Sequence, residues 1–217
     1  MKPSEIYLSK VAQEELIHDE KQLALLQNMD VLQNQITRRS TRWFYKEHIK
    51  GLYINGEVGG GKTQLMDIFF ESLDIKKKKR LHFHRFMQKL HQDLDDLSGQ
   101  IDPVQLAAVN LARDTEVLCF DEFFVEDIGD AMLLARFMGK LFKLPVSLVA
   151  TSNSSPDDLY KNGLHRDRFL PAIQAINDNC EVYELNSNQD YRLRTLEQQE
   201  IFILSKDDSG NEKIQKI

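Results

Sequence analysis

The sequence contains little that would place the chain in a membrane or cross-link it. None of its apolar runs approaches the length of a membrane span, and charged residues between positions 5 and 15 interrupt the stretch where a signal peptide would be apolar. The two cysteines, Cys119 and Cys180, each lie in an apolar run, which is typical of buried thiols in a reducing compartment rather than of a disulfide. We therefore expect a cytoplasmic protein without membrane insertion.

The chain also lacks an excess of positive charge. Its 28 Lys and Arg residues are outnumbered by 34 Asp and Glu residues, for a net charge of −6. This balance argues against broad affinity for nucleic acid. One basic run, Lys76 to Arg80, is interpreted as a solvated loop before a strand. We therefore expect nucleic acid not to be a partner.

Hydrophobic periodicity predicts the fold class. Between Ser4 and Gln35, apolar residues recur at helical spacing without a sustained heptad, which indicates one or two amphipathic helices that pack on the main domain. From Gly51 on, short β-rich runs alternate with helical segments, as in an α/β protein whose parallel sheet carries helices on both faces. The expected strands are 51–55, 80–85, 117–120, 146–150 and 181–185, and the expected helices are 62–73, 86–97, 102–112, 127–142 and 156–162.

The residues between the first strand and the first helix of this core carry the strongest motif. Residues 56–63 read Gly-Glu-Val-Gly-Gly-Gly-Lys-Thr, the pattern of a loop whose backbone N–H groups surround phosphate at a helix N-terminus. Lys62 is expected to face solvent and to reach the β- and γ-phosphates, and Thr63 to bind Mg²⁺. The motif predicts binding of ATP with Mg²⁺. The predicted cofactor-binding residues are Gly56, Glu57, Val58, Gly59, Gly60, Gly61, Lys62, Thr63 and Gln64.

A second motif follows the strand predicted at 117–120. Asp121 and Glu122 come directly after four apolar residues, and the carboxyl edge of a parallel sheet is where ligands bind. Asp121 would orient the Mg²⁺ coordination shell through water, and Glu122 would polarise the attacking water. Such a pair is weak evidence alone, because acidic residues also cap helices. Together with the glycine-rich loop, it predicts a hydrolytic site.

A third group of polar residues follows the strand predicted at 146–150. Asn153 is a candidate to contact the γ-phosphate or the nucleophilic water, an assignment that depends on the other two motifs. Farther along, Arg166 and Arg168 flank Asp167. Either arginine could complete a neighbouring subunit's site by neutralising charge in the transition state, but spacing alone favours a surface ion pair with Asp167.

Other conspicuous side chains receive structural interpretations. His82 and His84 are expected on one face of the second strand, but no matching donors support a metal site there, so we interpret them as polar contacts near the nucleotide or a subunit interface. The aromatic run Trp43 to Tyr45 could line an adenine pocket, yet it is more typical of a packing anchor. The only metal ligands predicted are Thr63 and Asp121.

Taken together, the motifs resemble the Afg-type AAA+ ATPases, and in particular their bacterial cell-division branch. The resemblance runs from about Tyr7 to Glu197. It implies a sheet in the order 5-1-4-3-2, oligomeric ATP hydrolysis, and action on a protein partner, FtsZ or another filament-forming protein at the division site. The blocks that carry it are residues 56–70, 80–87 (Arg-Leu-His-Phe-His-Arg-Phe-Met), 118–125 (Leu-Cys-Phe-Asp-Glu-Phe-Phe-Val), 158–173 and 190–196.

The resemblance also assigns roles and shows two departures. It implies the phosphate and Mg²⁺ roles given above, a sensor role for Asn153, and an arginine finger at Arg168 or Arg166 in preference to the surface ion pair. Gly60 stands where the family commonly has arginine, which should leave the backbone cradle intact. Family members continue beyond Ile217, which predicts that a C-terminal lid is absent and that this chain is a monomer or weak oligomer, whereas full-length members form homo-oligomers.

These expectations define an organisation and three functional classes. At 217 residues the chain can bury one sizeable core. We expect an N-terminal helical segment at 1–49, an AAA+ P-loop ATPase core at 50–197, and a polar tail or hairpin at 198–217. The leading class is an ATPase that acts on a protein; the alternatives are a nucleic-acid-directed loader or helicase-type ATPase and a nucleotide-gated scaffold with little turnover.

Overall fold

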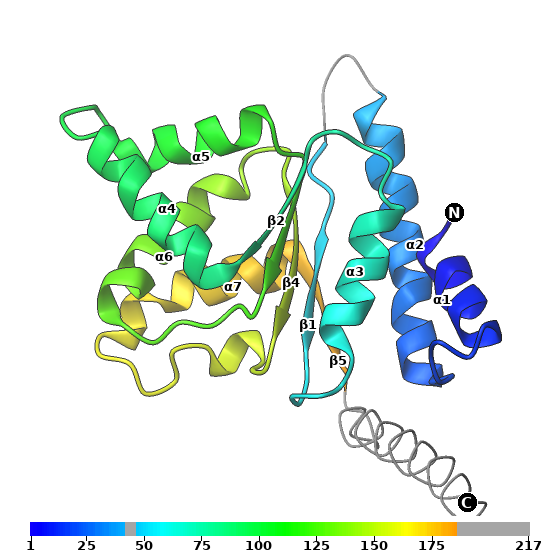
Figure 1. Cartoon of the computed structure of the whole chain (residues 1–217). Helices are drawn as coiled ribbons and strands as arrows, with labels where there is room; N and C mark the ends of the chain where they lie inside the picture. The colour runs from blue at the N-terminus through cyan, green and yellow to red at the C-terminus, as the bar shows by residue number, and fades with distance from the viewer. Residues whose placement is uncertain (42–46, 186–217) are drawn as a thin grey trace, which may run out of the picture.

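The computed structural model describes residues 1–41 and 47–185 (Figure 1). The chain begins with two helices and then alternates strands and helices, with two short 3-10 turns, η1 and η2, after the fourth strand. In chain order the elements are α1 (Pro3–Ala12), α2 (Glu20–Ser40), β1 (Gly51–Asn55), α3 (Lys62–Ser72), β2 (Lys78–His82), α4 (Phe83–Asp96), α5 (Pro103–Arg113), β3 (Val117–Asp121), α6 (Ile128–Leu141), β4 (Ser147–Ser152), η1 (Pro156–Asp158), η2 (Arg166–Arg168), α7 (Leu170–Asn179) and β5 (Cys180–Glu184).

The five strands form one parallel sheet in the order β2-β3-β4-β1-β5. This is the predicted order 5-1-4-3-2 taken from the opposite edge, so the expected fold class is confirmed. In the register, Leu52 of β1 pairs with Val149 of β4 and with Glu181 of β5. Because all strands run the same way, the residues that follow β1, β3 and β4 meet at one edge of the sheet.

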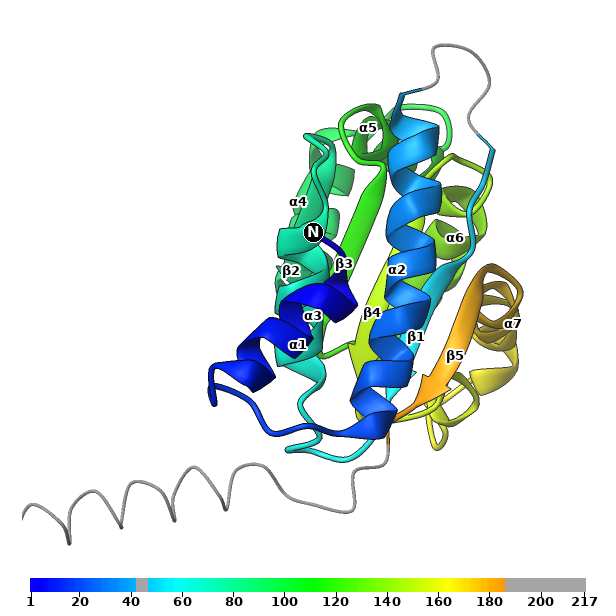
Figure 2. The same cartoon turned by 90° about the vertical axis from the view of Figure 1, so that its right-hand side faces the viewer.

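Helices cover both faces of the sheet, with α1, α2 and α3 on one side and α4 to α7 on the other (Figures 1 and 2). Strand β1 shows why both faces are apolar. Leu52 and Ile54 belong to the cluster that contains α2 and α3, whereas Tyr53 packs with the opposite helices. Successive side chains of a strand point to opposite faces, so a strand buried on both sides is a continuous apolar run.

The two N-terminal helices lie against α3 and bring the start of α2 to the glycine-rich loop. Asp19 caps α2 by accepting hydrogen bonds from the backbone N–H groups of Lys21 and Gln22. The buried Tyr7 hydroxyl donates to the Ile17 carbonyl at 3.0 Å and accepts from the Asp19 N–H at 2.8 Å. This fixed connection positions Gln22, whose side chain contacts the loop.

Two predicted elements differ from the structure. The strand expected at 80–85 is wrong: β2 ends at His82 and α4 starts at Phe83, so His84 lies on a helix. The buried positions Phe83, Phe86 and Leu90 follow helical spacing and decide this boundary. The helix expected at 156–162 is also wrong, because only the turn η1 forms there and Tyr160 has a positive φ of 52°.

Helix α7 was not expected from the periodicity. Its apolar face consists of Ala172, Ile173 and Ile176, and Pro171 in its first turn is a start signal that could have located it. The aromatic run at 43–45, the block at 190–196 and the segment 198–217 lie outside the described residues.

Cys119 and Cys180 are buried free thiols, and burial raises the pKa of each to about 12. Among the described helices, none combines the length and the hydrophobicity that crossing a bilayer requires.

Candidate functional site

The glycine-rich loop, residues 56–63, connects the end of β1 to the start of α3 and depends on its glycines. Gly59 and Gly61 have φ values of +92° and +83°, in the region that favours glycine. A Cβ on Gly61 would lie 2.6 Å from Nε2 of Gln22, and one on Gly56 would lie 2.2 Å from the Leu185 carbonyl oxygen. The loop therefore needs glycine both for its conformation and for its close contacts, and it ends at the N-terminus of α3, where unpaired N–H groups favour anions.

The sequence predicted that the Lys62 side chain faces solvent, and this prediction is wrong. The side chain is 9% exposed, and its ammonium group donates to the carbonyl oxygens of Gly56 and Glu57, each at 2.7 Å. A buried ammonium group must be hydrogen-bonded, and the carbonyls of the curved loop satisfy it. The side chain therefore lies along the inside of the loop and holds its two ends together.

The opposite side of the site comes from β3 and β4. A cavity of about 330 Å³ brings the loop residues 58–64 together with Glu122, Thr151, Ser152 and Asn153. Glu122 has a φ of +55°, and its N–H donates to the Thr151 hydroxyl at 3.3 Å. This bond fixes the unusual backbone of Glu122, whose side chain is 69% exposed. The structure thus gathers most of the predicted site residues at the carboxyl edge of the sheet.

Thr151 and Ser152 were not singled out in the sequence. Both are buried, and the Ser152 hydroxyl donates to the Phe123 carbonyl and accepts from the Ser154 N–H. These bonds join the loop after β3 to the loop after β4. The signal that could have found them is their position between an apolar strand and Asn153.

Asp121 lies apart from the residues that line this cavity. It is 5% exposed and lines a separate hollow of about 310 Å³ with Arg80, His82 and Arg85. Its Oδ2 accepts from Nε of Arg80 at 2.7 Å, and its Oδ1 accepts from Nη2 at 3.1 Å. Nη1 of Arg80 also donates to Asp67 on α3. Although burial alone lowers the pKa of Arg80, its bonds to the two carboxylates raise it overall. Sequence reasoning missed Arg80, because it was treated as the end of a basic run.

His82, the last residue of β2, lies near the site, whereas His84 lies on α4 and not on the same strand as predicted. Nδ1 of His82 lies 3.9 Å from Oε2 of Glu122, and the His82 and His84 rings are 6.0 Å apart. Within residues 1–41 and 47–185, no cluster of three or more His, Cys, Asp or Glu side chains could hold a metal ion by itself. A cation at this site would therefore need ligands from a bound nucleotide as well.

The side chains do fit a hard cation that arrives with phosphate. Thr63, Thr151 and Glu122 line one cavity, and their hydroxyl and carboxylate groups are oxygen donors of the kind that Mg²⁺ prefers. Thr63 is exposed at the second position of α3, next to the loop. Mg²⁺ binds through few protein ligands plus phosphate oxygens and water, so this sparse set is sufficient.

The two candidate finger arginines lie on η2 and do not line the chain's own cavity. Arg166 is half-buried and donates to the Asp157 carbonyl, whereas Arg168 is exposed. Among the described residues, neither forms an ion pair with Asp167. The surface pair that spacing alone favoured is therefore not observed, and Arg168 projects from the segment between β4 and α7.

The sheet order, the glycine-rich loop at the start of α3 and the polar ends of β3 and β4 define a P-loop NTPase fold. The family model described as AFG1-like ATPase matches residues 1–217, and the chain belongs to this family. Over 169 residues it is 51% identical to "Cell division protein ZapE" of Escherichia coli K12, a match that covers 78% of this chain and 45% of that protein. It is also 40% identical over 158 residues to "Lactation elevated protein 1 homolog B" of Danio rerio, covering 68% of this chain and 31% of the relative.

These matches confirm the resemblance stated from the motifs, and the chain spans at most about half the length of these relatives. Solved structures agree on the fold. The DnaC helicase loader matches with a TM-score of 0.56 at 17% identity, covering 77% of this chain and 92% of that one. AMPPCP-bound DnaA from Aquifex aeolicus matches with a TM-score of 0.57 at 15% identity, covering 86% and 53%. At such identities the likeness shows the fold alone.

Proposed function

We propose that the chain binds and hydrolyses ATP with Mg²⁺ and uses the cycle to act on a protein partner in bacterial cell division, with FtsZ as the first candidate. The observation that carries the hydrolytic part is the single cavity formed by residues 58–64, Glu122 and Asn153. Family membership and the match to a cell-division protein support the rest.

Each side chain of the cavity has a role that its position supports. Lys62 and the N–H groups of the loop would bind the phosphates, and Glu122 would accept a hydrogen bond from the attacking water and orient it. Asn153 would contact the γ-phosphate or that water. Thr63 would hold Mg²⁺, with Asp121 acting through water; Mg²⁺ supplies the charge that offsets charge developing on the phosphate oxygens.

Arg168 would act in a neighbouring subunit's site. It is exposed and lies outside the chain's own cavity, so it contributes nothing to binding within one subunit. An arginine supplied from a neighbour can neutralise transition-state charge, which makes hydrolysis depend on assembly. The proposed active form is therefore a homo-oligomer.

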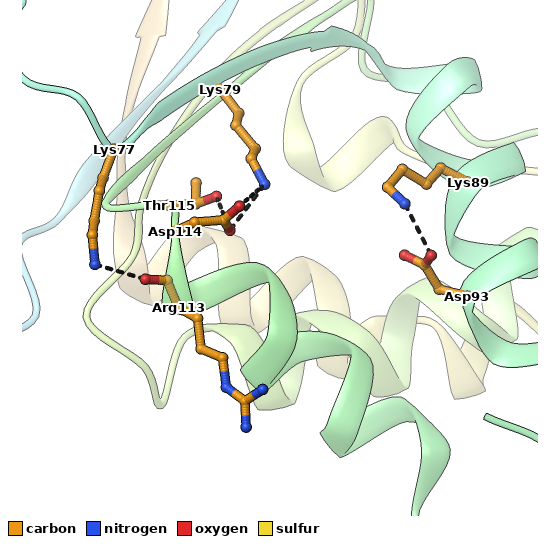
Figure 3. A network of polar contacts seen from close by, with 7 residues as sticks. All are labelled: Lys77, Lys79, Lys89, Asp93, Arg113, Asp114 and Thr115. Atoms are coloured by element: carbon orange, nitrogen blue, oxygen red, sulfur yellow. Dashed lines mark hydrogen bonds and ion pairs between the residues drawn. The ribbon is translucent and has the colours of Figure 1, made fainter. Parts of the chain in front are cut away.

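A protein partner is favoured over nucleic acid by the contacts that the basic run at 76–80 makes within the protein. Lys77 donates to the Arg113 carbonyl, and Lys79 donates to both oxygens of Asp114 at 2.9 Å (Figure 3). Lys78 donates to the Phe70 and Leu73 carbonyls at the end of α3. The run therefore joins β2 to the ends of α3 and α5. Its ammonium groups are held against the protein, and that of Lys79 is offset by Asp114, which restricts their contact with a phosphate backbone.

The Glu122→Gln variant tests the function most directly. The amide retains the shape of the carboxylate but loses the basicity that orients water, so ATP binding should persist while hydrolysis falls by about 10²–10⁴-fold. This variant, loaded with ATP, is then sedimented with FtsZ polymers and, separately, with duplex DNA at physiological salt. Glu126→Gln, at an exposed position in the following loop, is the matched control.

We expect the loaded variant to sediment with FtsZ polymers and to remain in the supernatant with DNA. Hydrolysis at the parent rate would contradict the role of Glu122. ATP-dependent sedimentation with DNA alone would move the assignment to the loader class. A parent chain that binds ATP tightly but shows no measurable hydrolysis would instead be the nucleotide-gated scaffold.

A further inference from the structure

Asp121 is held by a guanidinium group on both of its oxygens. Arg80, on the neighbouring strand β2, donates from Nε to one oxygen at 2.7 Å and from Nη2 to the other at 3.1 Å. The pair is shielded from solvent, with side-chain exposures of 19% for Arg80 and 7% for Asp121. A two-point contact of this kind fixes the orientation of the carboxylate.

The same arginine has a second carboxylate within reach. Its Nη1 donates to Asp67, which lies one turn after Thr63 on α3 and has a side chain 51% exposed. Arg80 therefore bridges β3 and α3, the two elements that carry the predicted Mg²⁺ ligands. If Arg80 loosened its hold on Asp121, Asp67 would still provide a partner, so the arginine would not be left buried without a counter-charge.

We propose that Arg80 is a positioning residue that restrains Asp121, so that the site captures a divalent cation only when phosphate arrives with it. With both carboxylate oxygens engaged and the negative charge offset, a cation alone gains little from Asp121. Phosphate oxygens supply the missing charge and ligands, and the cation then competes successfully for Asp121 while Arg80 keeps its bond to Asp67. This inference rests on the proposed function, because it concerns the metal of that site.

The size of the effect follows from ordinary electrostatics. A cation must displace charge-assisted hydrogen bonds to reach the oxygens of Asp121, and the loss of one such bond corresponds to about tenfold or more in affinity. Removing the guanidinium group should therefore tighten cation binding by about tenfold or more. The gain should require Asp121 and should be seen without nucleotide.

The test is a calorimetric titration of the nucleotide-free chain with Mn²⁺, a probe that takes the same oxygen ligands as Mg²⁺. Arg80→Gln should bind Mn²⁺ about tenfold more tightly than the parent, and the double variant Arg80→Gln/Asp121→Asn should lose that gain. Arg85→Gln is the matched control, because Arg85 lines the same hollow, is exposed and carries the same charge. It should titrate like the parent.

Arg80→Gln removes a buried partner, so its folding is checked by thermal unfolding with and without Mn²⁺. Mn²⁺ should raise its midpoint more than that of the parent. If the variant does not fold, Arg80→Lys provides the test, because an ammonium group lacks the planar fork with which Arg80 bonds to Asp121 and Asp67 at once, and a smaller gain is expected. Unchanged or weaker Mn²⁺ binding in whichever variant folds would overturn the proposal. Failure of the parent to bind ATP would instead overturn the proposed function, and the Mn²⁺ titration would stand independently.

Discussion

Replacing Lys62 by alanine should have two separate effects, one on nucleotide binding and one on the fold. The ammonium group donates to the Gly56 and Glu57 carbonyls, and the side chain is 9% exposed. Water can replace it at Glu57, where the bond is partly exposed, but less readily at Gly56, where the bond is buried. The structural loss is then that of one unsatisfied buried acceptor, about 1–3 kcal/mol of unfolding free energy.

For a chain of this length, each kcal/mol shifts the unfolding midpoint by about 2–4 °C, so the nucleotide-free Lys62→Ala variant should unfold about 2–12 °C below the parent. Its affinity for ATP should fall by about tenfold or more, because a charge-assisted contact to phosphate is lost. Calorimetric unfolding measures the first effect and a fluorescent ATP analogue measures the second.

Two further variants separate the causes. Lys62→Met keeps most of the aliphatic stem but has no donor, so it should lose stability and affinity nearly as alanine does. Lys143→Ala removes an exposed lysine and should leave both unchanged. A parent-like midpoint for Lys62→Ala would refute the stabilising role of the two carbonyl bonds, and a parent-like affinity would refute the assignment of the loop to phosphate.

Two other predictions concern the neighbouring subunit and helix α2. Mixing Arg168→Ala chains with Lys62→Ala chains should restore part of the ATPase activity, because some interfaces then pair an intact loop with an intact arginine. No recovery at any mixing ratio, in chains shown to assemble, would count against Arg168. Recovery with Arg166→Ala chains instead would assign the role to Arg166. Gln22→Ala should weaken ATP binding by about threefold to tenfold, the effect of one lost hydrogen bond. The control Gln27→Ala, on the exposed side of α2, should bind ATP like the parent. Equal ATP affinities for the two variants would show that Gln22 does not orient the loop.

The prediction for Gln22 follows from peptide geometry. Its Nε2 donates to the Gly60 carbonyl at 3.3 Å. In a trans peptide the carbonyl and the following N–H point in opposite directions, so holding the Gly60 oxygen toward α2 turns the Gly61 N–H away from α2. The N-terminal helices thus contribute to the loop without lining the cavity, and the sequence offers no local sign of that contact.

The parts of the fold that the sequence predicts are those set by local patterns. Strands β1, β3 and β4 are buried on both faces, so each is an unbroken apolar run ending in polar residues, and the glycine spacing of residues 56–63 locates the loop. Strand β2 lies at the sheet edge and has no fully buried residue, so its boundaries were misjudged. Helix α7 was missed because its apolar face is short and follows a charged segment, although Pro171 in its first turn is a start signal.

What the sequence could not predict depends on partners far along the chain. Lys77 and Lys79 look like solvated charge, but they reach the Arg113 carbonyl and the Asp114 carboxylate, 36 and 35 positions farther along the chain. Arg80 pairs with Asp121 across 41 positions of sequence. Charge patterns reveal the sign of a segment but not whether its charges are already paired.

The same consideration changes how the candidate site is understood. Both of its key charges have partners within the protein: Lys62 bonds to the loop's own carbonyls, and Asp121 bonds to Arg80. Under the proposed function, binding Mg²⁺ and ATP would be an exchange of partners, and the net affinity would be the difference between new and old contacts. Such a site binds its ligands with lower affinity than a count of its contacts suggests. Its loop and carboxylate are already ordered, however, which lowers the entropy cost of binding. In the proposed mechanism the lysine and the carboxylate would change partners together with the phosphates and the cation, so recognition of either ligand would depend on the other.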